Sequence, residues 1–168
     1  MVLGSTGMLG QALMVELKEQ GKTVIGVARE KAEICLDITN DKLLLQTIAD
    51  VNPKIIINSA VMGNLSYCEE NFTQSYLINS RVSAVISKYC IFNRNIYVYI
   101  STDHYYTGEK ERKHSEDCKV NLCNEYATTK YLGERLSLLN ENALIVRTNI
   151  VGFRYNKESP TFIEWALQ

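Results

Sequence analysis

The chain has 168 residues, of which 46% are hydrophobic, and its formal net charge is −1. This length is enough to bury one hydrophobic core, so a single globular domain is expected. The near-neutral charge argues against a nucleic-acid binder or a membrane-surface binder, because such proteins gather a basic excess on one face.

No apolar run approaches the roughly 20 residues that cross a bilayer, and the amino terminus lacks the pattern of a secretory signal. We therefore expect a cytoplasmic protein with small-molecule partners, without nucleic acid or membrane among them. The five cysteines are expected to be reduced thiols. His114, Cys118 and Cys123 lie close in sequence, but their spacing matches no standard zinc module, so no metal is expected.

Short β-branched runs alternate with longer amphipathic stretches along the chain. In chain order, the pattern predicts a strand at 1–3, a helix at 8–20, a strand at 23–27, a helix at 41–51, a strand at 54–58, a helix at 72–92, a strand at 96–101, a helix at 125–140 and a strand at 143–147. No repeat or linker marks a boundary, so residues 1–168 are taken as one domain.

Strict alternation of strand and helix is typical of βαβ units, whose crossovers are nearly always right-handed. The fold class expected is therefore α/β, a Rossmann-type doubly wound parallel sheet with helices on both faces. In such sheets ligands bind outside the carboxyl ends of the strands. The residues that follow each predicted strand are accordingly the candidates for a site.

Three glycines follow the first predicted strand, in the segment GSTGMLG. Gly4, Gly7 and Gly10 stand where a strand meets a helix, and Thr6 lies between the first two. Glycines at such a junction allow a tight turn, close approach of a pyrophosphate and close helix–strand packing, while the free amides of the helix face the anion. A dinucleotide is the ligand that this turn predicts.

The residues after the second predicted strand bear on which dinucleotide is bound. Dehydrogenases that prefer NAD usually carry an acidic residue here, which binds the ribose hydroxyls. Ala28 takes that place and Arg29 follows it, which favours NADP through its extra phosphate, although the neighbouring Glu30 leaves NAD open.

Tyr126 and Lys130 are four residues apart on a predicted helix, so both side chains lie on one face. A phenol titrates near pH 10, and a neighbouring ammonium lowers its pKa by favouring the phenolate. Ser101 and Thr102 end the fourth predicted strand, where a hydroxyl could hold a carbonyl oxygen. Together these groups predict carbonyl reduction by a nicotinamide cofactor.

Six motifs in order, GSTGMLG, LDIT, NSA, STDHYYTG, YATTKYLGE and VRTNIVG, resemble those of the extended short-chain dehydrogenases, and specifically the dTDP-4-dehydrorhamnose reductase group. The resemblance implies that Gly7, Met8 and Leu9 line the pyrophosphate, that Asp37 and Ile38 flank the adenine, and that Ser59, Ala60 and Val61 pass beneath the cofactor. It also implies that Tyr126 and Lys130 touch the nicotinamide ribose, and that Thr102 rather than Ser101 is the catalytic hydroxyl.

The activity implied by the resemblance is reduction of the 4-keto group of a nucleotide-linked deoxysugar for cell-surface polysaccharide, with NADP as cofactor and NAD as the other choice. A nucleotide-sugar epimerase or dehydratase, and a cofactor-binding regulatory subunit, remain as alternatives, and a homodimer is left open. The chain departs from the family at Ala127, Tyr105 and Tyr106, and in the segment NSAVMGNLSYCEE. It also stops before the carboxyl-terminal region that supplies most nucleotide-sugar contacts in the family.

Overall fold

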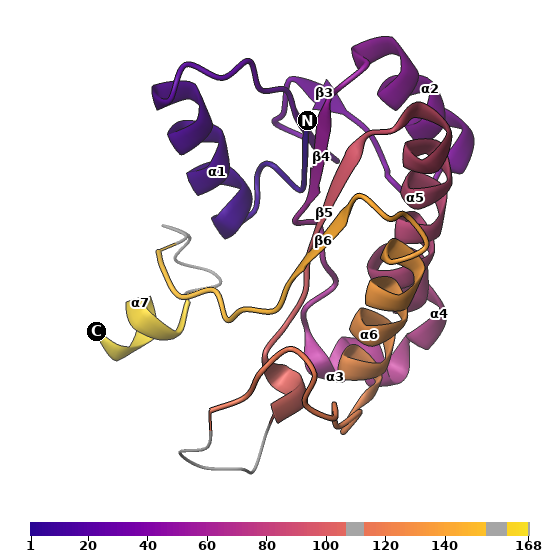
Figure 1. Ribbon diagram of the computed structural model, residues 1–168. Helices are drawn as coiled ribbons and strands as arrows, with labels where there is room; N and C mark the ends of the chain where they lie inside the picture. Colours follow the sequence, from indigo (N-terminus) through magenta and orange to yellow (C-terminus); the bar gives the residue numbers. More distant parts are fainter. Residues whose placement is uncertain (107–112, 154–160, 168) are drawn as a thin grey trace.

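A computed structural model describes residues 1–106, 113–153 and 161–167, and its centre is a six-stranded sheet (Figure 1). The strand order is β3-β2-β1-β4-β5-β6, and all paired neighbours are parallel. This is the doubly wound order, in which the chain reverses direction across the sheet between β1 and β4. The predicted fold class is confirmed.

The strands are β1 (Val2–Leu3), β2 (Gly26–Ala28), β3 (Ile34–Cys35), β4 (Ile55–Asn58), β5 (Ile96–Ile100) and β6 (Ala143–Val146). The helices are α1 (Met8–Glu19), α2 (Asp41–Val51), α3 (Leu65–Glu70), α4 (Phe72–Tyr76), α5 (Val82–Asn93), α6 (Glu125–Ser137) and α7 (Phe162–Ala166). A π-helical turn, η1 (Leu77–Arg81), joins α4 to α5, and a 3-10 turn, η2 (His104–Tyr106), follows β5.

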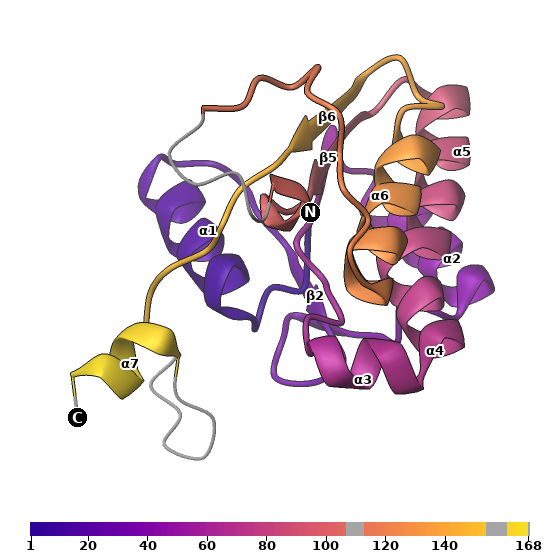
Figure 2. The same ribbon diagram turned by 90° about the horizontal axis from the view of Figure 1, so that it is seen from below.

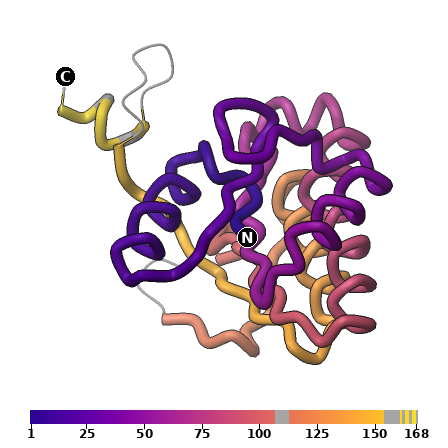
Figure 3. The backbone as a smooth tube through the Cα atoms, turned by 90° about the horizontal axis from the view of Figure 1, so that it is seen from above, coloured from indigo at the N-terminus to yellow at the C-terminus, as the bar shows by residue number. Residues whose placement is uncertain are grey.

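The helices cover the two faces of the sheet unequally. Figure 2 and Figure 3 place α2, α4, α5 and α6 together on one side and α1 on the other. The side chains that alternate toward the α1 side include Ile55, Ile96 and Leu144, which are 43%, 45% and 56% exposed. Register pairs Ile55 with Ile96 and Val98 with Leu144, so these apolar side chains form one stripe across β4, β5 and β6.

The hydrophobic core lies between the sheet and the α2–α5–α6 layer. Its buried members come from β1, β2, β4, β5 and the segment after β3 on one side and from α2 and α5 on the other: Leu3, Val27, Leu36, Ile38, Leu44, Ile48, Ile56, Val82, Ile86, Cys90, Tyr97 and Tyr99. Both core tyrosines turn their hydroxyls toward the helices, where Tyr97 bonds Asn58 and Ser83 and Tyr99 bonds the Asn79 carbonyl.

Several of the expected elements differ in the structure: the expected strand 23–27 appears as β2 (Gly26–Ala28), and the expected helix 125–140 ends at Ser137. Strand and helix do not alternate strictly, because β2 is joined to β3 by the short loop 29–33 without a helix. The two-residue β3 and the short α3 carry too few residues to show a period, so the sequence pattern did not predict them. The expected helix 72–92 is present as α4 and α5 with η1 between them.

The π turn η1 gives its carbonyl oxygens partners outside the helix. Tyr99 Oη donates to the Asn79 carbonyl at 2.7 Å, and Asn79 and Ser80 are fully buried. Such turns usually appear as a local widening of an α-helix and often mark functional positions. Here the turn brings the Asn79 side chain to the loop that follows β4.

None of the helices in the described part of the chain is both long and apolar enough to cross a membrane.

Candidate active site

Two adjoining cavities lie along the carboxyl edge of the sheet. The first, about 260 Å³, opens over β1, β2 and β4, and the second, about 400 Å³, opens over β1, β5 and β6. Gly7, Ser59 and Val61 line both cavities, so together they form one continuous groove at the point where the strand order reverses. This crevice is where doubly wound sheets bind nucleotides.

The three glycines of the first turn are each required for a different reason. Gly4 has a positive φ of 77°, and a Cβ on it would lie 2.7 Å from the Ala60 nitrogen. A Cβ on Gly10 would overlap the Gly4 carbonyl, so the helix could not pack against the strand. The nearest atom to a Cβ on Gly7 is the Gly4 oxygen at 3.2 Å, and Gly7 otherwise faces open space. The turn therefore leaves room for a phosphate at Gly7.

No side chain caps the amino terminus of α1, whose cap residue is Gly7. The first amides of this helix therefore face the groove at the point where the first and second cavities meet. Unpaired amides and the positive end of the helix dipole favour an anion. The glycine turn and the helix start fit the pyrophosphate of a dinucleotide.

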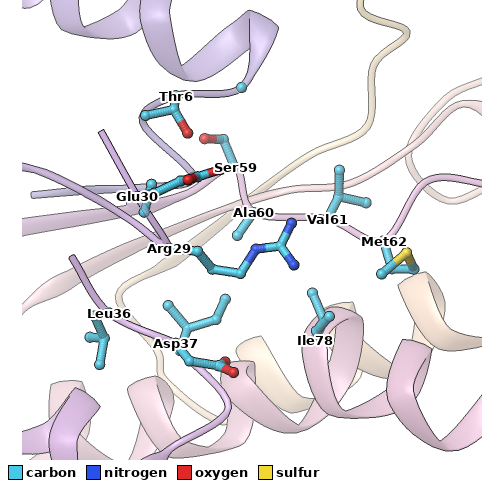
Figure 4. A pocket seen from close by; sticks show the side chains of 14 residues that line it. Thr6, Arg29, Glu30, Leu36, Asp37, Ser59, Ala60, Val61, Met62 and Ile78 are labelled. Atoms are coloured by element: carbon cyan, nitrogen blue, oxygen red, sulfur yellow. The ribbon is translucent and has the colours of Figure 1, made fainter. Parts of the chain in front are cut away.

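Arg29 is the cation among the residues that line the first cavity, beside two carboxylates, Glu30 and Asp37, of which Asp37 is already hydrogen-bonded. Figure 4 shows the Arg29 side chain extending across the cavity between Ala60 and Ile78. Asp37 accepts bonds from the Thr39 amide at 2.9 Å and from its hydroxyl at 2.8 Å, and these bonds lower the Asp37 pKa. Arg29 is therefore the lining group suited to a phosphate, whereas the Asp37 carboxylate is occupied by its bonds to Thr39 in the segment before α2.

The loop after β4 forms the floor between the two cavities. Ser59 Oγ donates to the Leu3 carbonyl at 2.7 Å, which fastens the end of β4 to β1. Met62 is held at both its amide and its carbonyl by the Asn79 side chain, at 2.8 and 3.0 Å. The Asn79 amide also donates to Thr129 at 3.1 Å, so the π turn ties the floor of the groove to α6.

The second cavity brings Thr102, Tyr126 and Lys130 together from β5 and α6. Asn124 starts α6 by accepting a bond from the Ala127 amide at 2.8 Å, which sets the rotation of the first turn. The pKa of Tyr126 is raised by burial, and a hydrogen bond with Thr102 acts to lower it. The hydroxyl and the phenol are thus in contact in the second cavity.

Lys130 is almost wholly buried, at 2% exposure, and its Nζ donates to the Ile100 carbonyl at 2.7 Å. The ammonium also lies 4.2 Å from the centre of the Tyr99 ring. Burial lowers the Lys130 pKa to about 7, and the negative charge of Glu134 acts against that change. At Tyr126, burial is the largest influence on the pKa, and Lys130 is not among the groups that act on it.

Ser101 turns its hydroxyl away from the chemistry. Its Oγ donates to Glu134 Oε1 at 2.5 Å and contacts the Tyr105 hydroxyl at 3.1 Å. Glu134 is buried and paired with Arg147, whose Nη2 lies 2.7 Å from Oε2. Since Ser101 is occupied in this network, Thr102 is the hydroxyl left to face the cavity.

The two tyrosines that depart from the family pattern belong to the same network. Arg147 donates to the Tyr106 hydroxyl at 2.7 Å and lies 5.4 Å from the Tyr105 ring centre. The departure at Ala127 places a buried residue at the first turn of α6. None of these three changes removes a group from the cavity.

Every residue predicted for the site lies in the groove. The first cavity is lined by Gly4, Thr6, Gly7, Arg29, Asp37, Ile38, Ser59, Ala60 and Val61, and the second by Gly7, Met8, Leu9, Gly10, Ser59, Val61, Thr102, Tyr126 and Lys130. Their roles remain predictions.

Other lining residues were not predicted: Leu36, Met62, Ile78, Ile100, Thr148, Asn149 and Ile150. Thr148 and Asn149 could have been found from their place just after a predicted strand. Ile78 and Asn79 carried no such signal, because the π turn that presents them is not visible in the spacing of apolar residues.

Within the described ranges, no three His, Cys, Asp or Glu side chains are grouped as metal ligands would be.

The comparisons with known proteins agree with this geometry. A family model described as the RmlD substrate binding domain matches residues 1–165. A spore coat polysaccharide biosynthesis protein of Bacillus subtilis is 28% identical over all of this chain and 57% of its own length. A dTDP-4-dehydrorhamnose reductase of Aggregatibacter actinomycetemcomitans is 29% identical over 89% of this chain and 50% of its own.

A different kind of relative also matches. The beta subunit of methionine adenosyltransferase 2 from Xenopus laevis is 28% identical over 90% of this chain and 46% of its own length. The chain therefore spans about half the length of the curated relatives that it matches.

Solved structures show the same fold. A dTDP-4-dehydrorhamnose reductase from Clostridium acetobutylicum superimposes with a TM-score of 0.80 at 30% identity, over 88% of this chain and 52% of that chain. The Bacillus anthracis enzyme in complex with NADP gives a TM-score of 0.78 at 26% identity, over 87% of this chain and 51% of that chain.

Proposed function

The chain belongs to the RmlD substrate-binding-domain family, and from this premise we propose that it is the cofactor-binding part of a short-chain-dehydrogenase-type reductase. Its substrate is the 4-keto group of a nucleotide-linked deoxysugar. The observation that carries the proposal is the convergence of Thr102, Tyr126 and Lys130 in a cavity that continues from the glycine turn. The reductases among the relatives and solved structures support the same reaction class.

The residues of the groove fit a dinucleotide phosphate. Gly7 and the start of α1 would hold the pyrophosphate, because a Cβ at Gly4 or Gly10 would collide with backbone while Gly7 faces open space. Arg29 is the cation of the first cavity and would receive the 2′-phosphate of NADP, which is the bound cofactor in the Bacillus anthracis structure. When bound, the nicotinamide supplies the hydride.

The three polar groups of the second cavity then have separate tasks. Thr102 donates a hydrogen bond to the substrate carbonyl oxygen, and Tyr126 gives that oxygen its proton as the hydride reaches carbon. Lys130 would bond the nicotinamide ribose, and in its protonated form its charge would favour the phenolate that remains.

A second function is favoured by one specific observation. Several relatives are beta subunits of methionine adenosyltransferase 2 rather than reductases. In that role the chain would bind the dinucleotide and assemble with another enzyme without turning over a sugar. The two functions share the first cavity and differ in their need for Tyr126.

The test measures NADPH binding and NADPH oxidation on the same samples, with dTDP-, GDP- and UDP-linked 4-keto sugars as substrates. NADPH at a hundredfold its dissociation constant should stabilise the protein by about 2.7 kcal/mol. Tyr126→Phe should slow oxidation by about 10² to 10⁴-fold, because it removes the acid, with NADPH affinity changed only a few-fold.

Gly7→Val is the matched control, since it fills the space left for the pyrophosphate and should abolish NADPH binding and oxidation together. Binding without oxidation of any sugar would contradict the reductase. If Tyr126→Phe then kept full biological activity and Gly7→Val lost it, the subunit role would stand in its place.

A further inference from the structure

His104 contacts two of the three side chains to which the proposed function assigns the chemistry. Its backbone amide donates to Thr102 Oγ1 at 3.1 Å. Its ring meets the Tyr126 ring edge-on, with centroids 5.9 Å apart and planes 69° apart. A titratable imidazole therefore lies against the reacting groups of the second cavity.

The hydrogen bond between His104 and Asn124 defines which ring nitrogen carries the proton. His104 Nε2 lies 2.8 Å from Asn124 Nδ2. The orientation of the Asn124 amide is fixed, because its Oδ1 accepts the Ala127 amide at 2.8 Å as the cap of α6. Turning the amide over would set its NH₂ group against that N–H, donor against donor.

An amide nitrogen only donates, so His104 Nε2 must accept, and an accepting nitrogen carries no proton. The ring is therefore neutral with its proton on Nδ1. An imidazolium has a proton on both nitrogens and cannot accept from Asn124. Protonation must break this bond and place a positive charge beside Tyr126.

We propose that His104 is a positioning residue that acts through Asn124. Its neutral, Nδ1-protonated ring accepts the Asn124 hydrogen bond, and this bond holds the first turn of α6, and with it Tyr126, in place. Protonation of the ring breaks the bond and frees this turn. The positioning role rests on the proposed function, whereas the tautomer and its coupling to α6 do not. Histidine as a residue type changes charge between about pH 5 and 8, which is the range over which the titration below is run.

The other titratable groups around this contact are carboxylates, a phenol and a thiol. Asp103 and Cys68 act electrostatically on Tyr126. Glu69 on α3 accepts the Glu125 amide at 2.9 Å and so also meets the first turn of α6. Among these groups, Asn124 is the one that bonds the His104 ring directly.

The direct experiment is ¹⁵N NMR of the imidazole rings during a pH titration. The chain has two histidines, and the spectrum of His104→Phe identifies the signal of His104. At the alkaline end, Nε2 of His104 should resonate as an unprotonated nitrogen. The backbone amides of Tyr126 and Ala127 should shift with the same midpoint as the His104 ring.

Two substitutions of Asn124 keep the helix cap and change what faces His104. Asn124→Asp presents an acceptor, so the neutral ring should move its proton to Nε2 and the titration midpoint should rise by about one pH unit or more. Asn124→Ser presents no amide, so the Ala127 amide should no longer follow the ring, while Tyr126 still senses the charge of the ring through their direct contact.

A protonated Nε2 in the unaltered chain at high pH, or an Nε2 that stays unprotonated at high pH in Asn124→Asp, would overturn the proposal. So would a His104 titration that leaves both amides unmoved.

Activity provides the separate readout of positioning. As pH falls through the His104 midpoint, the rate of NADPH oxidation at saturating NADPH should fall several-fold in the unaltered chain relative to Asn124→Asp, in which protonation strengthens the contact. Equal acid profiles would remove the positioning role. If no NADPH is oxidised at all, the proposed function has failed, and the NMR result still decides the tautomer.

Discussion

Lys130 is a buried cation whose environment works against its charge. The ammonium has the Ile100 carbonyl and the Tyr99 ring as partners, but burial lowers its pKa from 10.5 to about 7. A group with such a pKa can gain or lose a proton at neutral pH. The same burial must make the free energy of unfolding depend on pH, because the Lys130 pKa then differs between the folded and unfolded states.

The sign follows from the proton count of each state. Between pH 7 and about pH 10 the unfolded lysine keeps its proton while the folded Lys130 has largely lost it. The unfolded state binds more protons, so the free energy of unfolding should rise with pH through this window.

We predict that this free energy rises between pH 7 and 9 by about 1 kcal/mol per pH unit more than in Lys130→Met, which cannot titrate. Urea denaturation at several pH values measures the difference. Lys42→Met replaces an exposed lysine and should keep the slope of the unaltered chain. Parallel curves for Lys130→Met and the unaltered chain would show that Lys130 stays protonated in the fold.

At the level of single elements, the long helices and the strands of the sheet centre were predictable from the sequence. Apolar period and β-branched composition placed β4, β5 and α2 to within a residue or two. The interruption of the 72–92 helix was not predictable, because η1 depends on a tertiary contact, the bond from Tyr99 to the Asn79 carbonyl. This tertiary contact, rather than a helix-breaking residue, sets the geometry of η1.

The same kind of contact sets the packing between α6 and η1. Gly133 is buried on α6, and a Cβ there would overlap the Asn79 carbonyl and the Tyr99 hydroxyl. On an open helix surface, Gly→Ala stabilises by about 1 kcal/mol because alanine is the better helix former. Here the helix would have to move away from the turn that holds the floor of the groove.

Gly133→Ala should therefore reverse the usual sign and lower the free energy of unfolding by about 1–3 kcal/mol, as overpacking does in a dense core. It should also weaken NADPH binding, since the Met62 loop depends on Asn79. Leu132→Ala, at a more exposed position of the same helix, is the control and should change both quantities little. A stabilised Gly133→Ala would mean that the helices separate without cost.

At the scale of the whole molecule, the doubly wound sheet and the edge that holds the site followed from the order of the elements alone. Parallel strands bring their carboxyl ends together, so residues as distant as Gly7, Thr102 and Tyr126 were expected at one edge, and the structure places them there. The direction of side chains at that edge did not follow. Ser101 and Thr102 both line the second cavity, and the bond from Ser101 to the buried Glu134 explains why the Thr102 hydroxyl is the one available there.

The unequal covering of the sheet has a consequence for how the chain behaves in concentrated solution. The stripe that includes Ile55, Ile96 and Leu144 lies on the α1 side and stays in contact with water. Contiguous apolar surface of this kind promotes association between molecules. This hydrophobic association strengthens with warming and with kosmotropic salt. Light scattering should therefore report reversible clustering of the chain that grows with ammonium sulfate.

Leu144→Lys places a charge at the β6 end of the stripe and should suppress that clustering. NADPH binding should be unchanged, because Leu144 lies on β6 away from the residues that line the groove. Leu139→Lys, at an exposed leucine beyond the end of α6, should leave the clustering as it was. The uncovered face thus links the architecture of one sheet to the colloidal behaviour of the protein.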